Sequence, residues 1–422
     1  MIRKLLNTSR LEGVSQSIRI NHEQEVTPES VGFNAKRAEA IWQSVVNLYL
    51  TGTQPAITFC LRRQGKIVFN RSIGYLTGNG PKDQANTPRV VATPDMPVCL
   101  FSASKAVTAL LMHMLAEDGL VNLLDPVSYY LPEFGKHGKR NITVHQILSH
   151  RSGIPRVAKD TPIDVLWDEN EIWRLICDTK PISSSGNDLS YHALTGGFVL
   201  GRVLEKVTGN TIQDYIDKKI RQPMAMEYFT YGISEDKRHK LATNYATGPR
   251  PIFPITKVIK RALGADIDTV EQVINSSEWY RSVMPAGNLI GTAEEVSRFY
   301  QMMLNGGEWE GKQICQENTV RRAVHEYGSL QFDRTLMIPM RYSAGLMLGG
   351  SPIGMWGKNS RAAFGHIGLL NKLCWADEAR DISVSVLTTG IPIIAHHIPA
   401  LFSMVNAITQ NCPRDREVSL TM

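Results

Sequence analysis

Segments with strand character lie near both ends of the chain, whereas the middle of the chain has the apolar spacing of helices. Residues 56–76 contain two β-rich runs on either side of Gln64-Gly65, a pattern that is typical of a hairpin. Residues 371–390 predict a strand, a turn and a second strand, in which apolar residues alternate with serines from Ile382 onward. The simplest fold that pairs these strands is one antiparallel sheet built from both ends, with a helical region inserted between them.

The predicted fold class is therefore α+β, an α/β sandwich in which helices flank the antiparallel sheet. We expect a discontinuous sheet domain of residues 1–90 and 331–422 and a mostly helical domain of residues 91–330, with the functional site between the two. Residues 1–33 are polar and aperiodic, which predicts an irregular arm, and Asn34 is expected to cap the first helix.

Three helices are the clearest after that first one. Residues 107–115 place apolar side chains at the spacing of one helix face, and Gly119 ends this helix. Residues 194–208 repeat the pattern, and a last helix is expected at about residues 392–410. His113 falls on the polar side of the first apolar stripe, so its side chain is expected to face solvent.

The composition is that of an ordinary globular protein, since 43% of the residues are hydrophobic and 20% are charged. The 46 basic and 40 acidic residues leave a net charge of +6 that is spread along the chain, so neither nucleic acid nor a membrane surface is an expected partner. The six cysteines form no CxxC pair, and no apolar run predicts a signal peptide or a membrane span. We expect a cytoplasmic protein that acts on a small molecule with no cofactor and no metal.

A short catalytic pattern, Ser-x-x-Lys, occurs twice, whereas the GxSxG elbow, the HExxH metal motif and the Walker A loop are absent. The copy from Ser234 to Lys237 lies in a run of charges and predicts a solvated loop. The copy from Ser102 to Lys105 lies where an extended loop meets an amphipathic helix.

Two interpretations of the copy at Ser102 remain open on these grounds. Residues i and i+3 share a helix face, so the Lys105 amine can reach the Ser102 hydroxyl, and the free amides at a helix start can stabilise an oxyanion. Alternatively, Ser102 is only a helix cap and Lys105 is a surface charge.

Five ordered segments decide between these interpretations, because together they resemble the serine β-lactamase and penicillin-recognising family. The resemblance is greatest to class C β-lactamases and to their esterase relatives, the family VIII carboxylesterases, and it covers most of the chain. The segments are residues 101–134, 142–155, 190–209, 284–307 and 364–390. Five segments in one order are far more specific than a single Ser-x-x-Lys.

The resemblance implies a role for individual residues. Ser102 matches the family's nucleophile, Lys105 its partner and Tyr191 the tyrosine of the Tyr-x-Asn motif. The backbone N–H groups of Ser102 and Leu369 match the oxyanion hole. These roles imply acyl transfer through an acyl-serine intermediate. Either Lys105 or Tyr191 can be the base, and a lysine cation and a tyrosine phenolate are expected to stabilise each other.

Departures from the family pattern bear on the substrate. Ala193 stands where the family has the asparagine that binds a substrate amide, and His366-Ile367-Gly368 stands in place of Lys-Thr-Gly. A histidine is mostly uncharged above pH 7, so both changes weaken the recognition of an anionic acylamino β-lactam. A neutral ester needs neither contact. His192, next to the tyrosine, is expected either to line the substrate pocket or to pack beneath it.

The function expected from this pattern is a serine carboxylesterase for short to medium acyl chains, with weak β-lactam hydrolysis as a side activity. The alternatives are an acyltransferase of the same fold, a β-lactamase or D-alanyl peptidase, and a non-catalytic binding module. Trp356 and Tyr342 are candidates for lining an acyl pocket, because aromatic side chains are frequent in such pockets.

Overall fold

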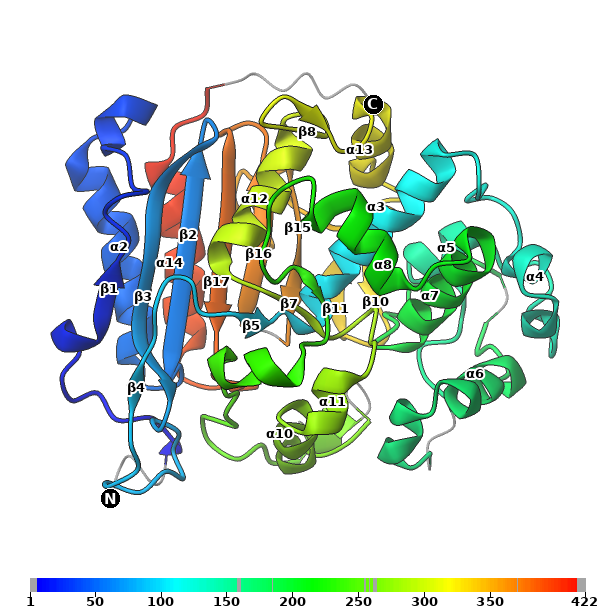
Figure 1. Ribbon diagram of the computed structural model, residues 1–422, viewed down its shortest axis with the longest axis horizontal. Helices are drawn as coiled ribbons and strands as arrows, with labels where there is room; N and C mark the ends of the chain where they lie inside the picture. Colours follow the sequence, from blue (N-terminus) through cyan, green and yellow to red (C-terminus); the bar gives the residue numbers. More distant parts are fainter. Residues whose placement is uncertain are drawn as a thin grey trace.

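The computed structural model describes residues 6–157, 161–183, 185–253, 256–257, 259–260, 264–369 and 371–415. Its centre is an antiparallel sheet of eight strands in the order β1-β3-β2-β17-β16-β15-β12, with β4 paired to β3 (Figure 1). These strands are β1 (Ile18–Ile20), β2 (Ala56–Arg63), β3 (Lys66–Thr77), β4 (Val90–Val91), β12 (Met347–Leu348), β15 (Ala363–Gly368), β16 (Lys372–Asp377) and β17 (Ile382–Thr388). Because β2 pairs with β17, the sheet is built from both ends of the chain, as predicted.

Helices cover the sheet and make up much of the remaining chain. The α-helices are α2 (Ala35–Leu50), α3 (Ser104–Glu117), α4 (Val127–Tyr130), α5 (Val144–Leu148), α6 (Glu169–Asp178), α7 (Thr195–Thr208), α8 (Ile212–Ile216), α10 (Ile267–Ile274), α11 (Ser277–Arg281), α12 (Ala293–Leu304), α13 (Glu317–Val324) and α14 (Ile398–Asn411). The smaller strands are β5 (Val98–Cys99), β6 (Thr230–Tyr231), β7 (Leu289–Gly291), β8 (Glu308–Trp309), β9 (Lys312–Gln313), β10 (Gln331–Asp333), β11 (Ile338–Met340), β13 (Ile353–Gly354) and β14 (Gly357–Lys358).

Alternate residues of the sheet face two different helical layers, as the two-residue period of a strand requires. Phe59 of β2 and its cross-strand partner Val386 of β17 belong to the core that α2 and α14 cover. The next residue, Cys60, faces the opposite way, and its Sγ lies 3.1 Å from the hydroxyl of Ser297 in α12. The sheet therefore has helices on both faces, which confirms the predicted sandwich (Figure 1).

The first 33 residues differ from the expected irregular arm. Ile18–Ile20 form an edge strand that pairs with residues 71–73 of β3. A strand of three residues is too short to produce a periodic pattern, and its position depends on a partner about fifty positions away. Asn34 caps α2 as predicted, because its side chain accepts a hydrogen bond from the backbone N–H of Arg37 at 3.0 Å.

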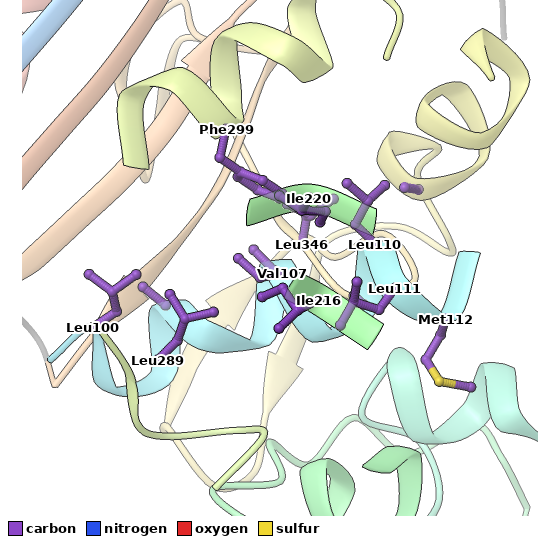
Figure 2. Packing of buried hydrophobic residues seen from close by; sticks show 14 of the residues in the cluster. Leu100, Val107, Leu110, Leu111, Met112, Ile216, Ile220, Leu289, Phe299 and Leu346 are labelled. Atoms are coloured by element: carbon purple, nitrogen blue, oxygen red, sulfur yellow. The ribbon is translucent and has the colours of Figure 1, made fainter. Parts of the chain in front are cut away.

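Helix α3 passes through the middle of a hydrophobic core. All residues from 104 to 115 are buried, and side chains of α3 such as Val107 and Leu110 pack among Ile216, Ile220 and Phe299 from neighbouring helical segments (Figure 2). A helix that is buried on all sides holds its residues in place more rigidly than a helix on the surface. The division of the chain into two domains stays a prediction.

His113 corrects one expectation about α3. Its side chain is fully buried rather than solvated: Nε2–H donates to the carbonyl oxygen of Ala344 at 3.0 Å, and Nδ1 accepts from Nε of Arg322 at 3.3 Å. The polar stripe of α3 faces other protein segments, so the usual rule that a polar helix face points to solvent does not apply here.

No helix in the described ranges has both the length and the apolar character needed to cross a lipid bilayer. All six cysteines are buried and unpaired.

Candidate active site

The turn that carries Ser102 joins β5 to α3. Just before the turn, the backbone N–H of Leu100 donates to the carbonyl oxygen of Leu289 at 2.8 Å, which ties the chain to β7. Phe101 then adopts a φ of +48°, a left-handed conformation that is rare for a bulky side chain. Residues Phe101–Ala103 form a single 3-10 turn. Ser102 therefore sits, half-buried, on a strained and well-anchored segment, as reactive residues often do.

The second serine of this motif, Ser104, has a different environment from Ser102. Its buried hydroxyl donates to the carbonyl oxygen of Phe101 at 2.5 Å and accepts from the backbone N–H of Leu289 at 3.0 Å. Both bonds fix the turn, so the Ser104 hydroxyl is already engaged. The N-cap position of α3 is Ala103, and no side chain caps the helix there. The interpretation of Ser102 as a helix cap is therefore wrong.

Lys105 is buried and its amine lies between three oxygens. Nζ is 3.1 Å from Oγ of Ser102, 2.7 Å from the carbonyl oxygen of Ala193 and 2.9 Å from the carbonyl oxygen of Ala286. Burial lowers the pKa of Lys105 to about 7, because the ammonium ion loses its hydration there. Near neutral pH a large fraction of the amine is uncharged.

Tyr191 lies in the irregular segment between α6 and α7, and its ring is close to the same amine. The centre of the ring is 4.9 Å from Nζ of Lys105. Burial raises the pKa of the Tyr191 phenol, a hydrogen bond to Ser102 opposes this rise in part, and the negative charge of Asp333 adds to it. Burial thus favours an uncharged amine and an uncharged phenol, in contrast to the ion pair that was expected from the sequence.

Strand β15 ends against the turn of Ser102. A β-carbon added at Gly368 would lie 2.0 Å from the carbonyl oxygen of Leu100, so only a glycine allows this approach. Leu369 follows with a left-handed φ of +42°. The structure therefore brings the end of β15, which directly precedes the predicted oxyanion residue Leu369, next to the segment that holds Ser102.

His366 lies in β15 and is fully buried. Its Nδ1–H donates to the carbonyl oxygen of Ile367 at 2.8 Å, and its Nε2 has no hydrogen-bond partner among the described residues. Burial, with a smaller contribution from the charge of Lys105, lowers the pKa of His366 to about 3. The side chain is therefore uncharged at neutral pH, and its ring centre is 6.2 Å from that of Tyr191.

Some neighbours of the site carried no recognisable sequence signal. His150 packs its ring against Tyr191, with 4.7 Å between the ring centres, and Asp333 accepts the backbone N–H of Tyr191 at 3.2 Å. The sequence candidate His192 is fully buried, with Nε2 3.0 Å from the hydroxyl of Ser152 and its ring centre 5.2 Å from that of His150. Ala286 contacts Lys105 only through its backbone carbonyl oxygen. Any residue type offers such a carbonyl, so the sequence carries no signal for this contact.

The remaining sequence candidates divide clearly. Ser234 is exposed beside a short 3-10 helix, which confirms the solvated loop. Trp356 is fully buried and stacks on Trp375 with 5.5 Å between the rings, so it belongs to the sheet core rather than to an acyl pocket. Tyr342 is buried with its ring centre 5.1 Å from that of His150.

Within the part of the chain that the structure describes, no three His, Cys, Asp or Glu side chains are grouped as metal ligands would be.

Comparisons with known proteins identify the family and the fold of this chain. Residues 42–395 match the family model "Beta-lactamase". Esterase/beta-lactamase LipL of Mycobacterium tuberculosis is 26% identical over 312 residues, which are 68% of each protein. A penicillin-binding protein homologue from Caulobacter crescentus superposes with a TM-score of 0.76 at 22% identity and covers 90% of this chain and 99% of that one.

A family VIII carboxylesterase superposes with a TM-score of 0.74 at 20% identity, over 89% of this chain and 98% of that one. At such identities the structural neighbours establish the fold, which is that of β-lactamases and transpeptidases. The family model covers well over half of the residues. The chain therefore belongs to the β-lactamase family of serine hydrolases.

Proposed function

We propose that this protein is a carboxylesterase that cleaves esters of short to medium acyl chains through an acyl-Ser102 intermediate. The contacts of Lys105 carry the proposal. An uncharged amine has two N–H donors and one lone pair. The two carbonyl oxygens of Ala193 and Ala286, at 2.7 and 2.9 Å, can take both donors. The lone pair is then left for the hydroxyl proton of Ser102, 3.1 Å away.

This assignment makes Lys105 the base of the acylation step. Oγ of Ser102 attacks the ester carbonyl carbon while its proton passes to Nζ of Lys105. The backbone N–H groups of Ser102 and Leu369 stabilise the oxyanion. Tyr191 gives its phenolic proton to the departing alkoxide and regains a proton from the Lys105 ammonium. Water then attacks the acyl-serine, its proton passes to the same pair, and Ser102 recovers its hydroxyl proton.

The surroundings of the nucleophile support a neutral substrate. Ala193 offers no side-chain amide, and its carbonyl oxygen is bonded to Lys105. His366 is uncharged and buried, so it supplies no positive charge for a substrate carboxylate. The names of two similar proteins, an esterase/beta-lactamase and a family VIII carboxylesterase, agree with an ester substrate. We further propose a free small-molecule substrate and the cytoplasm as the place of action.

The test is hydrolysis of p-nitrophenyl esters from C2 to C12 by wild type, Ser102→Ala and Ser234→Ala, together with a chromogenic cephalosporin. Wild type and Ser234→Ala are expected to cleave the short esters equally, and Ser102→Ala is expected to lose this activity. The Ser234 variant is the matched control, because it removes the serine of the second, exposed Ser-x-x-Lys.

Three other outcomes point elsewhere. Activity that persists in Ser102→Ala would refute the acyl-serine assignment. Cleavage of the cephalosporin without cleavage of esters would indicate a β-lactamase. Acyl transfer to an added alcohol at the expense of hydrolysis would identify an acyltransferase.

A further inference from the structure

The backbone around Tyr191 is held at three consecutive N–H groups, although the segment belongs to no helix or strand. The N–H of Ser190 donates to the carbonyl oxygen of His150 at 2.9 Å. The N–H of Tyr191 donates to Oδ1 of Asp333 at 3.2 Å, and the N–H of His192 donates to Nδ1 of His150 at 3.2 Å. A loop normally leaves such groups to water. Here all three are taken by residues that are distant in sequence.

His150 contributes both its backbone and its ring. It is buried, and its φ of +60° is the left-handed conformation that few side chains adopt readily. This conformation lets the carbonyl oxygen and Nδ1 of one residue reach the N–H groups on either side of Tyr191. The imidazole ring also packs against the phenol ring, with 4.7 Å between the centres.

Asp333 binds the backbone of the same segment at Tyr191, between the two N–H groups that His150 accepts. It ends β10 and is fully buried. Its Oδ1 accepts from the backbone N–H groups of Thr335 at 2.8 Å and Leu336 at 3.0 Å as well as from Tyr191. The carboxylate thus fixes its own turn and the tyrosine together. A further bond, from the N–H of Arg334 to the carbonyl oxygen of Leu189 at 3.0 Å, ties the two segments.

We propose that His150 and Asp333 are positioning residues that set the place of the Tyr191 phenol relative to Ser102 and Lys105. Neither residue donates or accepts a proton in the reaction. Both act through the backbone of residues 190–192. The proposal rests on the proposed function, in which Tyr191 transfers a proton at the ester. A proton donor that is displaced by about 1 Å loses on the order of 100-fold in rate.

The experiment compares pairs of variants that differ in whether a hydrogen-bond acceptor remains. In His150→Asn, the side-chain oxygen occupies the place of Nδ1 and asparagine tolerates the left-handed backbone, whereas His150→Leu removes the acceptor. Asp333→Asn keeps an oxygen at Oδ1, whereas Asp333→Leu does not. We expect the leucine variants to lower kcat about 100-fold with KM nearly unchanged, and the asparagine variants to stay within about tenfold of wild type.

A second measurement separates positioning from a general loss of structure. The His150→Leu change is repeated in a Tyr191→Phe background, which lacks the phenolic proton, and residual hydrolysis of ethyl acetate, whose alkoxide leaving group needs that proton, is followed at high enzyme concentration. If His150 acts through the Tyr191 hydroxyl, its replacement has little further effect there. An equal loss of kcat in both backgrounds overturns the proposal, and so does an asparagine variant that is as impaired as its leucine counterpart.

Failure of the proposed function would look different, because Ser102→Ala would then retain ester hydrolysis whatever the His150 and Asp333 variants did. If the leucine variants do not fold, His150→Asn and His150→Gln form the decisive pair, since glutamine carries its oxygen one bond too far. Equal kcat in these two variants also overturns the proposal.

Discussion

Gly368 lies directly against Leu100, since a β-carbon at Gly368 would lie 2.0 Å from the Leu100 carbonyl oxygen. The same glycine is paired with Lys372 in the sheet, so its backbone is held from both sides. The contact joins two segments that are far apart in the chain: the end of β15 and the turn before α3. The proposed oxyanion hole, made by Leu369 and Ser102, depends on this contact.

Gly368→Ala should therefore remove most of the activity. The added methyl group cannot be accommodated unless β15 and the Ser102 turn move apart, and the loss of one oxyanion donor costs about 100-fold to 1000-fold in kcat. Gly291→Ala is the matched control, because the β-carbon there would meet its nearest neighbour at an ordinary 3.4 Å. Ester hydrolysis by both variants checks the prediction, and an unimpaired Gly368→Ala would contradict it.

The pH profile should report the Lys105 amine. Burial lowers its pKa to about 7, and only the uncharged amine can accept the Ser102 proton. The value of kcat/KM should therefore rise with increasing pH through about 7, with the slope of a single proton. Lys105→Arg should be inactive at every pH in this range, because a guanidinium group stays charged. A profile that falls through pH 7 would exclude Lys105 as the base.

Substrate preference should shift when the family's residues are restored at the two positions that differ. Ala193→Asn combined with His366→Lys supplies an amide partner and a positive charge. We expect the ratio of cephalosporin to ester kcat/KM to rise about tenfold or more, since a hydrogen bond to a charged group contributes about 1.5–3 kcal/mol. The single variants apportion the effect between the two positions. An unchanged ratio would show that these residues do not set the preference.

Acidification should destabilise the fold through its buried histidines. Burial lowers the pKa of His113 to about 4 and that of His366 to about 3, whereas both titrate near 6.5 when unfolded. Above pH 6.5, both histidines are uncharged in the folded and the unfolded chain, and acid does not reduce the free energy of unfolding. As the pH falls from 6.5 toward the pKa values of the folded state, the unfolded chain binds protons that the folded chain does not, and the free energy of unfolding decreases. Each histidine costs about 2 kcal/mol between pH 6.5 and 5.

Thermal unfolding at pH 7.5 and 5.0 measures this effect. In His113→Gln, the side-chain amide can still donate to Ala344 but does not titrate, so its Tm should fall less on acidification than that of wild type. Equal falls in Tm would mean that His113 is protonated at no cost in the folded state.

The sequence was sufficient for the parts of the fold and site that depend on local patterns. The hairpin at Gln64, the cap at Asn34 and the spacing of Ser102 and Lys105 each lie within a few residues. The alternation in β17 also predicted that Ile382, Val384 and Val386 share one face of the sheet, and all three lie in the same hydrophobic cluster. The structure then places Tyr191 beside this pair, as the resemblance implied.

Other features depend on contacts between distant segments. His150 and Asp333 contact Tyr191 although they lie 41 and 142 positions away in the chain, and no local sequence pattern predicts either contact. The prediction that His113 faces solvent was wrong because α3 is covered on every side. Helical periodicity shows which side chains share a face, but it does not show whether another segment covers the polar face. The charge states of Lys105 and Tyr191 depend on burial, which sequence spacing does not reveal.

The pairing of the two chain ends also sets when the enzyme can become active during its synthesis. Ala56 donates its backbone N–H to the hydroxyl of Thr389, 333 positions later. A ribosome that has completed only residues 1–360 has already made Ser102, Lys105 and Tyr191, but β2 still lacks its second neighbour, β17, and Leu369 does not yet exist. The proposed ester cleavage must therefore wait until the last strands have left the ribosome, and until then the nascent chain carries an uncovered sheet edge that chaperones can bind.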